Sequence, residues 1–158
     1  MSPSNPDLIA FYSGGNLWIH NCATNQDIQL TNLSSEDVEI RGIVAGHPSY
    51  ITQEEFNRYS GFWWCPTPDP DEPKNAHFIL YEEVDASQVD IVALKAQEDV
   101  LERQRFPRAG GVNTRSNLKI IQFNSSSLEV RIHGFDIYQY FPWCEYVVRM
   151  DWTPDGEK

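Results

Sequence analysis

The chain has 158 residues, of which 41% are hydrophobic and 13% aromatic, and this composition predicts a folded domain, or part of a larger one, rather than a disordered chain. Twelve Lys and Arg residues against 23 Asp and Glu residues give a formal net charge of −11. Phosphate backbones and anionic lipids repel such a chain, so nucleic acid and membrane surfaces are poor partners, whereas cationic or amine-bearing ligands remain open.

The sequence indicates a reducing compartment. The longest apolar run near the start, residues 8–12, is too short for the core of a signal peptide or for a membrane span. The cysteines Cys22, Cys65 and Cys144 are far apart, odd in number and in no CxxC pair, which argues against a disulfide framework or a zinc site. We therefore expect a cytoplasmic protein without a metal or another cofactor.

The first third of the chain has the pattern of a β-meander. Short apolar strands are predicted at residues 8–12, 17–20 and 28–30, with turns at 13–16 and 23–26. A polar connection over residues 34–39 then leads to a further strand at 40–45.

A helical turn is predicted next. Thr52 is a suitable N-cap, and Glu55 three residues later completes a capping-box pattern. Phe56 and Tyr59 then lie on one helical face. This turn carries Glu54 and Glu55 and leads into an aromatic strand over residues 61–65.

The rest of the chain again favours short strands and loops. Four prolines in residues 66–73 predict an exposed loop, because proline cannot donate to a sheet. The elements expected after it are a strand at 77–84, a strand at 89–94, a short helix at 96–105, a loop at 105–111, a hairpin of 118–123 with 128–133, and a last strand at 146–152.

Many short strands indicate an all-β fold, which is a meander, a sandwich or a propeller. A weak internal repeat helps to choose, because Trp64-Cys65-Pro66 returns as Trp152-Thr153-Pro154 after 152 − 64 = 88 residues. That spacing is about twice the ~40–50 residues of a propeller blade, or it corresponds to one blade that carries an insertion. We expect a partial propeller that is cut within a repeat.

The usual catalytic motifs are missing from the sequence. It contains no GxSxG nucleophile motif, no HExxH zinc motif and no glycine-rich phosphate loop. The histidines His20, His47, His77 and His133 lack metal-ligand spacing and are interpreted as structural.

Two pairs of adjacent carboxylates remain as candidates. Glu82 and Glu83 lie within a predicted strand, where neighbouring side chains point to opposite faces, so we expect ordinary solvated or paired acids. Glu54 and Glu55 lie on a helical turn and can approach one site, where two carboxylates would accept two of the three N–H donors of a primary ammonium. The pattern equally allows Glu55 to close the capping box while Glu54 lies in water.

Several segments resemble the dipeptidyl peptidase IV family, and in particular its cytosolic branch of dipeptidyl peptidases 8 and 9. The segment with the strongest resemblance is residues 50–66, YITQEEFNRYSGFWWCP, which is similar to the double-glutamate segment of that family. Further similar segments, in the family's order, are FYSGGNLWI at 11–19, ILYEEVD at 79–85, RFPRAG at 105–110 and WTPDG at 152–156.

The resemblance implies an eight-bladed propeller that caps an α/β-hydrolase domain, in a homodimeric enzyme that releases N-terminal dipeptides with proline or alanine at the second position. It implies that Glu54 and Glu55 bind the α-amino group of the peptide, which sets the distance to the scissile bond. Glu82 and Glu83 match family sequence outside the substrate position and keep their structural interpretation.

The chain also departs from the family. The catalytic Ser, Asp and His belong to the hydrolase domain, and an arginine that assists at the substrate carbonyl lies upstream, so the segment is expected to hold about two of eight blades and to be inactive alone. Residues 113–116, NTRS, replace the family's usual Asn-Pro. A hypothesis of another class is a standalone β module that binds a protein partner through its open sheet edges.

Overall fold

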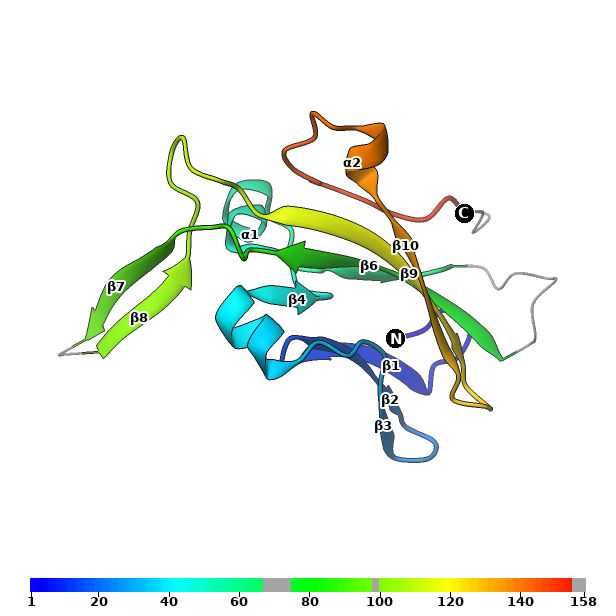
Figure 1. Ribbon diagram of the computed structural model, residues 1–158. Coiled ribbons are helices and arrows are strands. Elements are labelled where there is room, and N and C mark those ends of the chain that lie inside the picture. The colour runs from blue at the N-terminus through cyan, green and yellow to red at the C-terminus, as the bar shows by residue number, and fades with distance from the viewer. Residues whose placement is uncertain (67–74, 98–99, 155–158) are drawn as a thin grey trace.

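The computed structural model describes residues 1–66, 75–97 and 100–154, and Figure 1 shows that they form mainly β-sheet with short helical segments. The predicted loop at 66–73 lies outside the described residues except for Pro66.

The predicted meander is confirmed. Its strands are β1 (Leu8–Ser13), β2 (Asn16–Asn21) and β3 (Gln26–Gln29), which pair antiparallel in that order. Gly14 and Gly15 form the tight first turn with φ values of 55° and 81°, a region that glycine enters without strain. Asn25 supplies the positive φ of the second turn.

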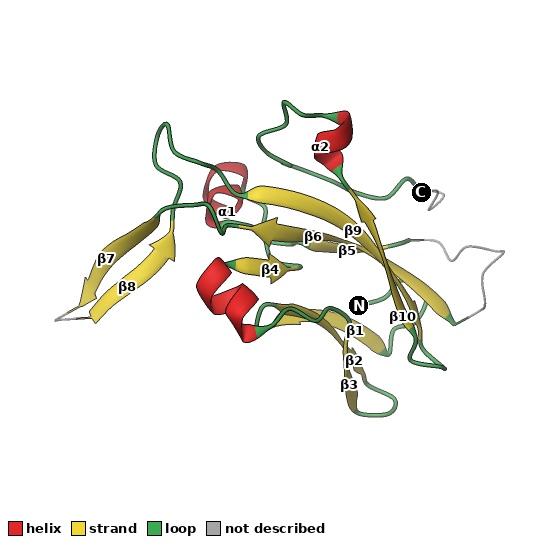
Figure 2. Ribbon diagram, in the orientation of Figure 1, coloured by secondary structure: helices red, strands yellow, loops and turns green. Residues whose placement is uncertain are grey.

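A second sheet has the strand order β10-β9-β6-β4, and β5 also pairs with β6 (Figure 2). Its longest strands, β6 (Ala76–Asp85) and β9 (Arg115–Asn124), pair antiparallel along their whole length. The expected strand over 77–84 and the expected hairpin at 118–133 are thus confirmed. The remaining strands are β4 (Ile43–Ala45), β5 (Phe62–Trp64) and β10 (Val130–Phe135).

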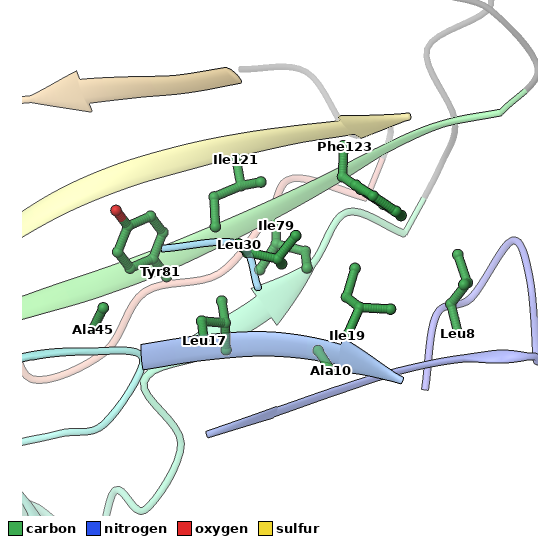
Figure 3. Packing of buried hydrophobic residues seen from close by; sticks show 10 residues of the cluster. All are labelled: Leu8, Ala10, Leu17, Ile19, Leu30, Ala45, Ile79, Tyr81, Ile121 and Phe123. Carbon is green, nitrogen blue, oxygen red and sulfur yellow. The ribbon is translucent and has the colours of Figure 1, made fainter. Parts of the chain in front are cut away.

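The core lies between the two sheets. Leu17 and Ile19 of β2 face Ile79 and Tyr81 of β6 across it, and all four are almost fully buried (Figure 3). Burial of each large apolar side chain stabilises the fold by roughly 1.5–3 kcal/mol, so this contact joins the meander to the second sheet. Sheets stacked face to face in this way are arranged as neighbouring propeller blades are.

The polar connection and the strand predicted at 34–45 are partly wrong. Residues 36–41 form a π-helical turn, η1 (Glu36–Arg41), and only the last part of the predicted strand is β4. Asp37 exchanges hydrogen bonds with Ser34 and pairs with Arg41 at 2.8 Å, which stabilises the turn locally. Gly42 ends it with a φ of 69°, so this glycine was the stop signal.

The short helix predicted at 96–105 is wrong. The backbone forms a hairpin of β7 (Ile91–Gln97) and β8 (Val100–Arg105), which we call the arm (Figure 1). Helix-favouring residue types are outweighed here by pairing with the preceding strand, an effect that local propensity cannot register. At the base of the arm, Arg105 donates to the carbonyl oxygens of Ser87, Val89 and Ile40.

The strand predicted at 146–152 is also wrong. A short helix, α2 (Ile137–Tyr140), follows β10, and residues 141–153 run on without pairing to any described strand. Arg58 donates hydrogen bonds to two carbonyls of this segment, and Trp152 of the segment donates to the carbonyl of Trp63.

Candidate functional site

The helix α1 (Tyr50–Phe56) carries Glu54 and Glu55, as the sequence predicts, but it begins earlier than expected. Ser49 is the N-cap, and its Oγ accepts a hydrogen bond from the backbone N–H of Thr52 at 3.3 Å. Thr52 is therefore not the cap but a buried residue of the first turn, and the expected capping box with Glu55 does not form. The residue that takes the N-cap position instead is Ser49, which lies three residues before Thr52 and directly follows Pro48.

The end of α1 separates two residues that were predicted to share a face. Phe56 packs against Tyr146 with ring centroids 5.5 Å apart. The helix then stops at Asn57, which takes a left-handed conformation with a φ of 50°. Tyr59 lies beyond this stop and is 67% exposed, so the shared face does not extend to it.

Glu54 and Glu55 are both exposed, next to each other on α1. Within the described part of the chain, neither carboxylate has a hydrogen bond or an ion pair, and Glu55 is free of the capping role that the sequence allowed. Two unneutralised carboxylates on one short helix form a local negative site that favours a cation with several N–H donors. We call Glu54 and Glu55 the acidic pair.

The segment that carries the acidic pair is closed at its base. Residues 47–60, which we call the α1 loop, leave the second sheet after Gly46 and return to it at Gly61. The backbone N–H of Gly46 donates to the carbonyl of Glu82, and the N–H of Glu82 donates to the carbonyl of Gly61, both at 2.8 Å. One residue of β6 thus holds both ends of the α1 loop.

The side chain of Glu82 is buried, with 1% of it exposed, and Arg58 Nη1 lies 2.8 Å from its Oε2. Ser116 of β9 donates a hydrogen bond to the other oxygen. The neighbouring Glu83 points the other way and pairs with Lys119 at 2.7 Å. The prediction that Glu82 and Glu83 diverge and are paired acids is confirmed.

Arg58 connects the α1 loop to the far end of the chain. Its guanidinium donates to the carbonyls of Val147 and Val148 in the C-terminal segment and to that of Ser60, each at 3.0 Å. It also lies over the ring of Trp63, 5.7 Å from the centroid. The sequence interpretation missed this residue, although an acid that is buried in a largely apolar strand such as β6 requires a cation nearby.

A groove of about 580 Å³ opens at the end of α1, and neither Glu54 nor Glu55 is among the residues that line it. Residues 56–60, Trp63 and residues 149–151 line it. Trp152 fixes its far side by donating from Nε1 to the carbonyl of Trp63 at 3.0 Å, so the two Trp-x-Pro segments of the sequence repeat lie together. The site therefore combines a negative helix with an adjacent open groove.

The four histidines lie in strands or loops, as expected. His77 is the most buried of them, and burial lowers the pKa of its imidazole below the ordinary value. His20 pairs with Asp27 on the meander at 2.8 Å. The cysteines Cys22, Cys65 and Cys144 are not joined by disulfides.

Comparisons with known proteins agree with this architecture. In the solved structures, the crystal structure of Porphyromonas gingivalis dipeptidyl peptidase 4 matches 84% of the chain with a TM-score of 0.61 and 21% identity, over 17% of its own length. That likeness confirms an all-β, partial-propeller fold.

The family model for the dipeptidyl peptidase IV N-terminal region matches residues 1–158. Dipeptidyl peptidase 8 of Homo sapiens is 33% identical over 99% of the chain, and that of Mus musculus is 32% identical over the same share. The chain therefore belongs to the dipeptidyl peptidase IV N-terminal region family. It spans 19% of the length of both relatives.

Across residues 1–66, 75–97 and 100–154, every helix is too short or too polar to cross a bilayer.

Proposed function

We propose that this chain is a propeller segment of a serine-type dipeptidyl peptidase, in which Glu54 and Glu55 bind the free α-amino group of a peptide substrate. The observation that carries the proposal is the exposed acidic pair on α1, whose carboxylates have no partner within the described residues. A peptide ammonium supplies the missing positive charge and three N–H donors.

The energetics of such an anchor suit an exopeptidase. Each charge-assisted hydrogen bond contributes roughly 1.5–3 kcal/mol when it is shielded from water. A fixed grip on the first amino group sets how far the chain reaches toward a nucleophile, so the position of cleavage follows from electrostatics. The groove at the end of α1 is lined from Phe56 onward, one residue after the acidic pair in the sequence.

The remaining parts of the proposed enzyme lie outside residues 1–158. An α/β-hydrolase domain of the same parent chain supplies Ser, Asp and His, and the parent is a cytoplasmic homodimer that acts on peptides with proline or alanine at the second position. The match to dipeptidyl peptidase 8, of whose length the chain spans 19%, supports a longer parent chain of the dipeptidyl peptidase family.

The first test uses a Gly-Pro chromogenic dipeptide. The purified 158-residue chain is expected to show no turnover, and turnover that a serine-directed inhibitor abolishes would overturn the expectation that the chain is inactive alone.

The second test addresses the acidic pair in the complete enzyme. Glu54→Gln and Glu55→Gln keep side-chain size and remove one charge each, and each is expected to lower kcat/KM roughly 100-fold, or ~2.7 kcal/mol. Glu39→Gln removes the same charge from an exposed position on η1 and serves as the matched control. If all three variants behave alike, the acidic pair does not bind substrate.

A standalone binding module is the second candidate, and it is favoured by the outer edge of β10, which pairs with no other strand of the described residues and whose residues 131–135 are exposed. Such an edge offers unpaired backbone groups to another chain. A sharp, cooperative thermal unfolding transition of the monomeric 158-residue chain would support the hypothesis of a standalone binding module. Aggregation or partial unfolding of the chain would support the hypothesis of a propeller segment.

A further inference from the structure

Glu82 and Arg58 bring the sheet, the α1 loop and the C-terminal segment together at one point. The backbone of Glu82 holds Gly46 and Gly61 at the base of the α1 loop. Its carboxylate holds Arg58, which follows the last helical residue of α1 by two positions. The same strand residue thus fixes the loop at its base and at the end of its helix.

The guanidinium of Arg58 donates hydrogen bonds in several fixed directions at once, and no other side chain at this position would reproduce that geometry. Its three nitrogens donate to three different carbonyls, those of Val147, Val148 and Ser60, while Nη1 also faces Glu82. A lysine would keep the charge but concentrate its donors on one atom. The C-terminal segment, which has no strand partner here, is held by these bonds at the helix end.

This arrangement bears on the acidic pair through the backbone of α1. Glu54 and Glu55 are exposed and have no fixed side-chain partner within the described residues, so their direction is set by the helix that carries them. Displacing a binding group by about 1 Å can cost two orders of magnitude in rate. A residue that holds the end of a two-turn helix therefore controls where the carboxylates point.

We propose that Arg58, held by the buried carboxylate of Glu82, is a positioning residue that sets the direction of the acidic pair. The proposal rests on the proposed function, because it assigns Arg58 a role that acts only through Glu54 and Glu55. A buried ion pair is weak evidence for a contribution to stability, whereas the fixed geometry of this pair suits a role in orienting the end of α1.

The test is a double-mutant cycle in the complete enzyme. Arg58→Lys is expected to lower kcat/KM for a Gly-Pro chromogenic dipeptide about 10-fold, chiefly by raising KM. In a Glu54→Gln, Glu55→Gln background the same substitution is expected to have no further effect, because there is no anchor left to misdirect. Labelling of the catalytic serine with a fluorophosphonate, which has no ammonium group, is expected to proceed at the parent rate in every variant.

The controls are matched to each change. Arg131→Lys makes the same substitution in an exposed pair with Glu129 and is expected to change nothing. Should Arg58→Lys fail to fold, which slow fluorophosphonate labelling would reveal, Glu82→Gln replaces it, with Glu83→Gln on the same strand as its control. Glu82→Gln keeps the size of the side chain and removes only the charge that orients Arg58.

The outcomes separate the two proposals. An equal loss on Arg58→Lys with and without the acidic pair would assign Arg58 a general structural role and overturn the positioning proposal alone. An unchanged kcat/KM for Arg58→Lys and Glu82→Gln, with Glu54→Gln impaired, would also overturn only the positioning proposal. An unchanged kcat/KM for Glu54→Gln and Glu55→Gln would overturn the proposed function itself.

Discussion

Gly61 lies directly against the backbone of Gly46, so closely that a methyl group at residue 61 would be 2.5 Å from the Gly46 carbonyl carbon. These two residues flank the α1 loop, and their contact closes its base. Only glycine, which has no side chain, permits this approach at position 61. The position of the α1 loop, and with it that of the acidic pair, therefore depends on a glycine at the base of the loop.

The first prediction follows from that contact. Gly61→Ala places a Cβ within 2.7 Å of Gly46 O and His47 N, which are backbone atoms that cannot rotate away. We expect the local structure to lose about 1–3 kcal/mol of stability. Amide hydrogen exchange in β4 and β5 reports this loss as faster exchange of both strands.

Gly134→Ala is the control for this change. Nothing lies within 4 Å of a Cβ at Gly134, which is in strand β10. Alanine there is expected to leave exchange unchanged or slower, because glycine is costly inside a strand. Equal rates of amide hydrogen exchange in β4 and β5 of the Gly61→Ala and Gly134→Ala variants would show that the close approach of Gly61 to Gly46 does not contribute to local stability.

The second prediction compares a buried with an exposed ion pair. Arg58→Ala leaves the carboxylate of Glu82 buried without its cation, a change that costs about 3–5 kcal/mol. Arg131→Ala removes a partner of Glu129 from an exposed pair and is expected to cost less than about 1 kcal/mol. Urea midpoints of the two variants, or hydrogen exchange of β6 where no single transition is seen, test this order.

The third prediction concerns His77, whose ring lies between those of Trp64 and Phe123. Its Nδ1 is 3.2 Å from Ser4 Oγ, and burial lowers its pKa below the ordinary value of 6.5. The folded chain therefore binds fewer protons than the unfolded chain below about pH 6.5. The stability that His77 contributes is complete above that pH and is lost progressively as the pH falls.

A melting-temperature series from pH 7.5 to pH 5.5 measures this effect. His77→Gln is expected to flatten the part of the pH dependence that this imidazole causes, whereas His133→Gln, at an exposed position of β10, should keep the parent slope. A parent slope that survives in His77→Gln would assign the effect to other groups.

The fourth prediction concerns the ammonium group of the substrate. Acetylation of the peptide N-terminus removes the positive charge, so the complete enzyme is expected to lose roughly 100-fold in binding a product-like peptide. The Glu54→Gln, Glu55→Gln double variant should bind the free and the acetylated peptide almost equally. Competition against a fluorescent peptide measures both, and strong discrimination by the double variant would place the ammonium elsewhere.

The sequence predicts those parts of the fold that depend on local chemistry. The turn at Gly14 and Gly15 and the apolar run of β6 define their elements without reference to the rest of the chain, and the structure agrees. The helix with Glu54 and Glu55 was also expected, although its cap is Ser49 rather than Thr52. Two candidate caps three residues apart cannot be separated by pattern alone.

The other errors involve partners that lie outside the segment in question. The backbone of β8 pairs with β7 although its residue types favour a helix, and residues 146–152 remain unpaired although they alternate as a strand does. Arg58 escaped notice because its partners Val147 and Val148 are 89 and 90 positions away. No sequence window shows that an arginine will bind carbonyl groups so far along the chain.

The arm differs from the α1 loop in how firmly it is tied to the sheet. Its strands pair with each other, while β6 and β9, from whose ends the arm projects, stay in unbroken register from Ala76↔Asn124 to Asp85↔Arg115 (Figure 1). Lengthening or shortening the arm would therefore leave the sheet unmoved. We therefore expect the length of the arm to vary freely among related sequences. The α1 loop is closed at its base and should tolerate little change in length.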